Sequence, residues 1–195
     1  MGYMKLLELT YTELRKKQDD ITYLFPSFKD RVKQVSRNGG TRLIKQKGDV
    51  WQFKTKSGTD SGVRYDNWVR FKDLDKQIRK FAKDKKVWLS DGSRIDLIKL
   101  ATKIMMKGDF ELFCSCPAYR FWGPAYILTK NKAKYTEPER RLPKIRNPQQ
   151  RGAYCKHLQI VMEVLPMYIG TLAKYLGSKY SDVIKKVEDN VRKSK

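Results

Sequence analysis

The sequence predicts an α+β protein, with a small antiparallel sheet, flanking helices and a helical C-terminal tail. Three observations lead to this class. Apolar and polar residues alternate in three runs between residues 41 and 71, as they do in half-buried antiparallel strands. Apolar residues recur at helical spacing over 74–82, 159–165 and 183–191. With 195 residues and 40 % hydrophobic content, the chain is long enough for one domain or two small ones.

The N-terminal third is predicted to hold a short strand, two helices and the sheet. Residues 3–9 form an apolar run typical of a strand, and Thr10 with Glu13 makes a capping box that opens a helix to about Asp20. A second short helix is expected over 27–35, and Asn38-Gly39-Gly40 is a strong turn signal. The three predicted strands that follow span 41–47, 49–55 and 63–71, joined at Gly48 and by the turn 57–62.

Helices dominate the expected structure beyond the sheet. A basic amphipathic helix is predicted over 74–82, followed by a brief strand at 86–89. Ser93-x-x-Asp96 is expected to cap a helix that runs through Met106 and closes at Gly108, before a strand at 110–113. After the helix at 159–165, Pro166 breaks the chain. The last predicted helices are 167–176, ended by Gly177, and one that starts at Ser181 with an apolar stripe.

Every cysteine and the single histidine fall into one pattern, Cys114-x-Cys116 followed by Cys155-x-His157. Three thiolates and one imidazole make a complete tetrahedral set for one Zn²⁺ ion, and a set with no open position is structural rather than catalytic. The alternative is that these residues are ordinary buried thiols and a histidine without a ligand role. A disulfide framework is not expected, because the number of cysteines is odd and nothing else marks secretion.

This spacing resembles the SWIM zinc finger, in which CxC follows a strand and CxH opens a helix. Residues 110–113 precede the first pair, Cys116-Pro117 matches the family's CxCP form, and Cys155 to Leu158 matches its CKHL form. The resemblance covers residues 109–165 and implies a zinc-stapled unit. The gap between the two pairs is longer than in many SWIM motifs. The string from Arg146 to His157 is also similar in style to small zinc proteins of tailed bacteriophages.

The resemblance divides the chain into an N-terminal α+β region at 1–108, a SWIM-like zinc unit at 109–166 and C-terminal helices at 167–195, integrated into one domain. Residues 117–154, hereafter the insertion, lie between the two ligand pairs. The insertion carries nine basic and two acidic residues, a net charge of +7, with aromatic residues interleaved. Prolines 124, 138, 143 and 148 are expected to prevent a long helix there.

A basic, aromatic loop fixed at both ends could follow a phosphate backbone and stack on bases. The candidate nucleic-acid contacts are Arg120, Trp122, Tyr126, Lys130, Lys132, Lys134, Arg140, Arg141, Lys144, Arg146 and Arg151. The alternative for the aromatic residues is that they cover the metal site as a small core, while the basic side chains are merely solvated.

The whole chain is strongly basic, with 43 Lys and Arg against 21 Asp and Glu, a formal net charge of +22. Such an excess is typical of proteins that neutralise a polyanion, most often nucleic acid. We therefore expect a nucleic-acid-binding protein that contacts the phosphate backbone without strong sequence specificity, with DNA favoured over RNA as the partner. The alternative is a structural or adaptor component of a virus particle, in which the zinc unit serves protein–protein contact.

Catalysis is not expected, because phosphate-loop, nucleophile-elbow and HExxH motifs are all missing from the sequence. The one histidine is assigned to the metal, which leaves no imidazole as a general base. The first residues lack the apolar run of a secretion signal, and no window reaches the length of a membrane-spanning helix. The expected location is a cytoplasm, that of a bacterial host if the protein is viral, or a virion assembled there, and no membrane partner is expected.

Overall fold

The computed structural model describes residues 10–193 except 14, 17, 19–26, 61, 146, 148–149 and 151. The predicted strand at 3–9 lies outside the described residues. The elements, in chain order, are α2 (Ser27–Arg37), β1 (Thr41–Lys47), β2 (Val50–Lys56), β3 (Arg64–Phe71), α3 (Leu74–Phe81), the 3-10 helix η1 (Lys85–Val87), α4 (Leu97–Lys107), β4 (Phe110–Cys114), α5 (Pro117–Phe121), α6 (Pro124–Lys130), α7 (Lys156–Val164), the 3-10 helix η2 (Leu165–Tyr168), α8 (Ile169–Lys179) and α9 (Ser181–Lys193).

The predicted α+β class is confirmed: four antiparallel strands form one sheet in the order β1-β2-β3-β4. The first three strands follow one another as a meander, and the turn at Gly48 has the left-handed φ of 63° that favours glycine. β4 arrives from a distant part of the sequence and pairs with β3, so that Asn67 lies opposite Cys114. A bulge between Leu43 and Lys45 interrupts the edge strand β1.

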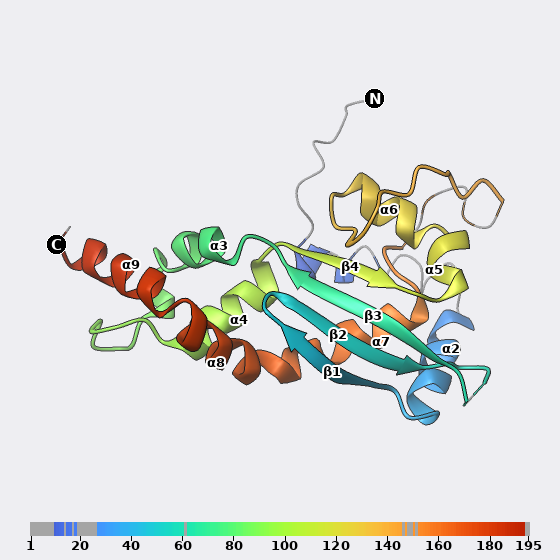
Figure 1. Ribbon diagram of the computed structural model, residues 1–195, viewed down its shortest axis with the longest axis horizontal. Coiled ribbons are helices and arrows are strands. Elements are labelled where there is room, and N and C mark those ends of the chain that lie inside the picture. Colours follow the sequence, from blue (N-terminus) through green and yellow to red (C-terminus); the bar gives the residue numbers. More distant parts are fainter. Residues whose placement is uncertain are drawn as a thin grey trace.

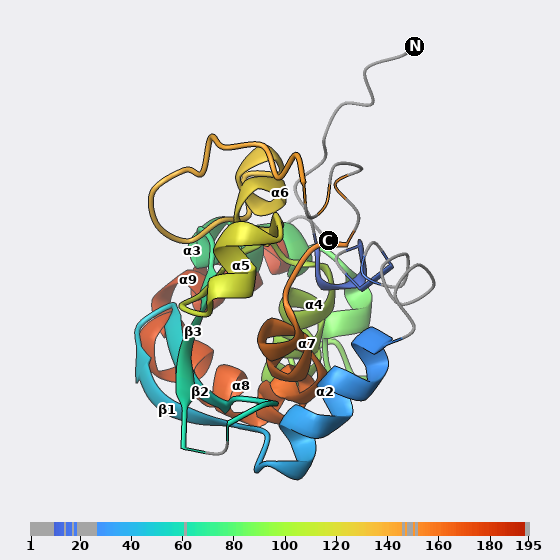
Figure 2. The ribbon, with the colours of Figure 1, turned by 90° about the vertical axis from the view of Figure 1, so that its right-hand side faces the viewer.

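The sheet and the helices form two layers (Figures 1 and 2). Helix α7 lies against one face, which we call the inner face, and contacts all four strands. Trp51, Phe53, Val69 and Phe71 point to this face and are completely buried. The rings of Trp51 and Phe71 pack edge to face, with 5.1 Å between their centroids. Helix α2 packs on α7, and α8 packs on α4.

No described helix lies over the opposite face, which is turned toward the reader in Figure 1. Residues directly opposite in neighbouring antiparallel strands share a face, so the register assigns the side chains of this outer face. The outer face consists of Arg42, Lys45, Lys47, Val50, Gln52, Lys54, Lys56, Arg64, Asp66, Trp68, Arg70, Glu111 and Phe113.

Most of the helix predictions are confirmed, including the capping box: the Thr10 N–H donates to the Glu13 carboxylate at 2.8 Å. Residues 11–13, 15–16 and 18 are helical, and the predicted end of this helix at about Asp20 lies outside the described residues. The predicted strand at 86–89 is wrong, because Lys86 and Val87 belong to the 3-10 helix η1 and only Trp88 makes an isolated bridge, to Ile95. The indole N–H of Trp88 donates to the carbonyl of Ala82, which holds this segment against the end of α3.

Gly177 does not end a helix as predicted; it lies inside α8, which continues to Lys179. A Cβ atom at this position would lie 2.8 Å from the Cδ1 atom of Leu97 in α4. The glycine therefore allows α8 to approach α4 closely, which is a packing role that a sequence pattern does not distinguish from a helix stop.

Helix α4 begins at Leu97, and its N-cap is Asp96. The sequence predicted a cap that starts at Ser93, but the side chain that caps the helix is that of Asp96. The Asp96 carboxylate accepts hydrogen bonds from the N–H groups of Ile98 and Lys99, at 2.9 and 3.2 Å. Because Asp96→Ala leaves both donors without this partner, we expect it to lower the free energy of unfolding by about 1 kcal/mol. Urea denaturation measures the change. Asp96→Asn keeps an acceptor and should stay near wild type; equal losses in both variants would contradict the cap.

Candidate metal centre

The four candidate ligands come from two chain segments that are distant in sequence but adjacent in the fold. Cys114 is the last residue of β4, and Cys116 is the N-cap of α5. Cys155 is the N-cap of α7, and His157 lies in the first turn of that helix. Two thiols thus stand at helix N-termini, where the backbone N–H groups favour negative charge. The local structure is the strand followed by CxC, and CxH opening a helix, that the sequence predicts.

The side chains of these four residues converge on one point. Their ligand atoms all lie within 4.8 Å of one another, and all four residues are at most 4 % exposed. A tetrahedral site with metal–sulfur bonds of about 2.3 Å sets its ligand atoms roughly 3.7 Å apart, so a small contraction completes the geometry. Cys114, Cys116, Cys155 and His157 could therefore bind one metal ion.

The chemistry of the cluster also fits a cation. The backbone N–H groups of Cys116 and Tyr119 point at the sulfurs of Cys114 and Cys116, at 3.4 and 3.3 Å. Neither ring nitrogen of His157 has a hydrogen-bond partner among the described residues, although both are buried. A buried imidazole without a partner is unfavourable, and coordination would satisfy one of its nitrogens.

Burial raises the pKa of the Cys114 and Cys155 thiols well above the ordinary value. The hydrogen bond from Cys114 lowers the pKa of the Cys116 thiol. Without a cation, therefore, this buried cluster does not favour three thiolates at once. A divalent ion supplies the opposite charge that makes three neighbouring thiolates stable.

Two tyrosines support the cluster, and sequence reasoning missed the role of both. The ring of Tyr65, from β3, lies 4.5 Å from the imidazole of His157, measured between ring centroids. Tyr119 packs on Phe113 and donates its hydroxyl to the carbonyl of Leu112 at 3.1 Å. Tyr65 is far from His157 in sequence, so no local pattern signals this contact. Tyr119 lies three residues after Cys116, and its helical spacing is the one available signal.

Comparisons of the chain with protein-family models, curated proteins and solved structures give no match in any of the three. The functional argument therefore rests on the residues of this chain.

The insertion forms two short helices, α5 and α6, and then an irregular segment. It also lies along the free edge of β4: the N–H of Leu112 donates to the carbonyl of Ala133, and the N–H of Tyr135 donates to the carbonyl of Leu112, at 2.8 and 3.0 Å. Among the described residues of the insertion there is no long helix, which agrees with the prolines. The edge pairing has no sequence signal that we recognised.

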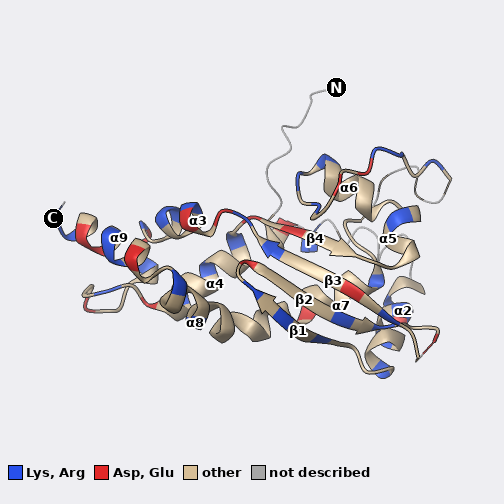
Figure 3. Cartoon of the chain, viewed as in Figure 1, with Lys and Arg blue, Asp and Glu red and all other residues tan. Residues whose placement is uncertain are grey.

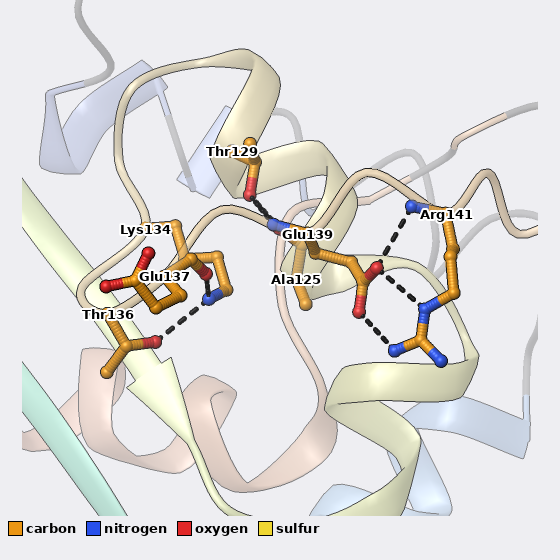
Figure 4. Close-up of polar contacts among 7 residues, drawn as sticks. All are labelled: Ala125, Thr129, Lys134, Thr136, Glu137, Glu139 and Arg141. Atoms are coloured by element: carbon orange, nitrogen blue, oxygen red, sulfur yellow. Dashed lines mark hydrogen bonds and ion pairs between the residues drawn. The ribbon is translucent and has the colours of Figure 1, made fainter.

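Arg141 and Lys134, which are among the predicted nucleic-acid contacts, are held by polar groups of the insertion (Figure 4). Arg141 forms a bidentate ion pair with Glu139, at 2.9 and 2.7 Å, and this contact lowers the pKa of Glu139 to about 2. Lys134 is half-buried and donates to the hydroxyl of Thr136 and the carbonyl of Glu137. These two cations are less available to an external anion than the sequence suggests.

The other predicted contacts are placed as follows. Arg120, Lys130, Lys132, Arg140 and Lys144 are exposed. Lys130 donates to Gln150 at 3.2 Å and lies over the half-buried ring of Tyr126. Trp122 is 40 % exposed, with the Arg31 guanidinium carbon 5.7 Å from its ring centroid. Arg146 and Arg151 lie outside the described residues.

Lys and Arg are spread over β1 to β3, the helices and the insertion rather than confined to one element (Figure 3). In the part of the chain that the structure describes, no helix has both the length and the apolar character that crossing a bilayer requires.

Proposed function

We propose that this protein is a zinc-stabilised nucleic-acid-binding protein that contacts the phosphate backbone without strong sequence specificity. The observation that carries the proposal is the charge: if every carboxylate neutralised one cation, 22 Lys and Arg side chains would remain. That excess exceeds what solubility requires, and nucleic acid is the common polyanion that compensates it.

Within this proposal the metal is a single structural Zn²⁺ ion. Thiolate and imidazole ligands in a tetrahedral set suit zinc, and four protein ligands leave no position for a substrate. The ligand order, with a strand before CxC and a helix after CxH, supports the likeness to SWIM zinc fingers. The ion would hold β4 to the start of α7, and with them both ends of the insertion. The protein is proposed to bind its partner, not to transform it.

The exposed cations of the insertion are the proposed phosphate contacts outside the sheet. Arg120→Gln, Arg140→Gln and Lys144→Gln combined should weaken binding for all sequences, and should lower the log–log salt slope by about 2 for single strands. The matched control combines Lys83→Gln, Lys85→Gln and Lys86→Gln, three exposed cations after α3, with the same change in net charge. Titration of labelled DNA and RNA at several salt concentrations measures both quantities.

The wild-type protein is expected to bind with submicromolar affinity and a steep salt slope. If it binds neither single nor double strands at low salt, despite its charge of +22, the proposed function is overturned. If it binds but the insertion variant matches the control, the contacts lie elsewhere on the protein.

A second candidate function has one observation in its favour. Four large apolar side chains of the insertion are exposed, which is unusual for a surface that only meets solvent: Phe121, Trp122, Leu142 and Ile145, the last at 90 %. They favour a protein-docking role, as in the alternative of a structural or adaptor component of a virus particle. Salt distinguishes the two functions, because apolar docking persists at salt concentrations that release a nucleic acid.

A further inference from the structure

The outer face of the sheet carries more cations than its own carboxylates can neutralise. It carries seven Lys and Arg against two carboxylates. One of these, Glu111, is paired with Arg70 at 2.5 Å, and the other, Asp66, accepts a hydrogen bond from Gln52 at 3.1 Å. The cations of β1 and β2 therefore dominate the electrostatic character of this face.

One cross-strand pair on this face places cation opposite cation, because Arg42 lies opposite Lys54. Like charges directly opposite each other destabilise an antiparallel sheet. An anion bound across β1 and β2 would remove this repulsion, so the pair is what a surface that binds an anionic partner would contain.

Aromatic side chains complete the same face. Trp68 and Phe113 lie opposite each other on β3 and β4, are partly exposed, and have ring centroids 5.2 Å apart. The insertion adds Tyr135, whose ring centroid lies 5.3 Å from the Arg70 guanidinium carbon. Beyond Phe113 a hollow of about 560 Å³ lies between β4 and the insertion, and Arg120 and Phe121 contribute to its lining.

We propose that the outer face of the sheet binds single-stranded nucleic acid, with the cations of β1 and β2 on phosphates and Trp68 and Phe113 against bases. This rests on the proposed function and assigns it a surface and a strand type. Basic grooves with aromatic side chains are the general means of holding a single strand. A duplex keeps its bases stacked and paired, so it would offer this face phosphates alone, whereas the bases of a single strand can reach the rings.

Three variants separate the electrostatic and stacking contributions. Arg42→Gln, Lys45→Gln and Lys54→Gln combined should weaken single-strand binding on the order of 100-fold and lower the salt slope by about 2. The triple substitution removes a like-charge pair, so its thermal stability should equal or exceed that of wild type, which a melting curve checks. Trp68→Leu should weaken single-strand binding about tenfold and leave duplex binding unchanged, whereas Trp68→Phe should retain most of the affinity.

The measurement is fluorescence anisotropy of labelled single-stranded DNA, single-stranded RNA and duplex DNA of equal length. The control combining Lys83→Gln, Lys85→Gln and Lys86→Gln, with the same loss of charge outside the sheet, should change the affinity by about twofold. Tryptophan fluorescence should be quenched on binding in wild type and less so in Trp68→Leu. The comparison of single-stranded DNA with single-stranded RNA shows whether the face prefers deoxyribose or ribose.

Any of four outcomes overturns the inference. Equal losses of single-strand affinity in the sheet variant and the control variant would mean that binding depends on the total charge of the protein and not on this face. Duplex binding as tight as single-strand binding, with Trp68→Leu indistinguishable from wild type, would exclude the stacking platform. Loss of binding in the insertion variant but not in the sheet variants would place the contact on the insertion, and the proposed function would then stand without this inference. If wild type binds no nucleic acid, both are overturned.

Discussion

Removal of the proposed zinc ion is expected to lower the melting temperature by more than about 10 °C, because the ion would join two segments that are distant in sequence. Cys114 ends the edge strand β4 and Cys116 follows it, whereas Cys155 and His157 open α7, the helix that contacts all four strands. Without the ion, three buried sulfurs and a buried imidazole lose their shared partner. Structural zinc contributes roughly 10 kcal/mol or more in small domains, which is comparable to the total stability of a globular protein.

Metal analysis of the purified protein should give one zinc per chain, and circular dichroism with and without a chelator should show the drop in melting temperature. The three thiols should become reactive toward a thiol reagent only after chelation. Cys155→Ser should reproduce the chelated state. Lys156→Ala, between two ligands in sequence, should keep both the zinc and the stability. Cys155→Ser with unchanged zinc content and melting temperature would exclude the metal centre.

Gly108→Ala is expected to destabilise the protein by about 3 kcal/mol, since the position has no room for a methyl group. A Cβ atom there would lie 1.9 Å from the Oε1 atom of Gln77 and 2.4 Å from the carbonyl oxygen of Ile104. Gln77 is buried and donates to the carbonyls of Lys72 and Asp109, at the start of α3 and beside β4. Displacing this side chain would break both hydrogen bonds as well as shift the end of α4.

Gly170→Ala provides the matched control, because it makes the same chemical change on an exposed position of α8. A Cβ atom at Gly170 meets nothing within 4 Å. Alanine is the better helix former, so this variant should be as stable as wild type or up to about 1 kcal/mol more stable. Chemical denaturation of both variants gives the two values. Changes of the same sign and size would show that the Gly108 site relaxes without cost.

The sequence predicted correctly those features that are decided within a few neighbouring residues. It also predicted the candidate ligands, because one pattern uses every cysteine and the single histidine. The capping box at Thr10 and Glu13, the turn at Gly48 and the alternation of β2 and β3 are each decided within a few residues. The candidate ligands were found because the chain has three cysteines and one histidine and the pattern uses them all. The four side chains converge because β4, which carries Cys114, pairs with β3, and α7, which carries His157, packs against the sheet.

Features that depend on tertiary contacts were not predictable in the same way. Gly177 looked like a helix stop, but it accommodates Leu97 from a different helix. Arg141 looked like an available cation, but Glu139 holds it in an ion pair. The alternation of residues 50–56 and 64–70 predicts which side chains point to the outer face of the sheet. The strand register is needed to show that Arg42 lies opposite Lys54. The spacing of residues within one strand or helix does not predict which side chain of another element will lie opposite it.

The two edges of the sheet have a consequence for how the protein behaves at high concentration. Exposed strand edges can pair with the edges of other chains and start aggregation. Here residues 133–135 occupy the edge of β4, whereas β1 combines a bulge with Arg42, Lys45 and Lys47. Bulges and charged side chains are the means by which natural proteins discourage such pairing. The cations of β1 that we assign to ligand binding would thus also keep unliganded molecules apart, and neutralising them would favour self-association.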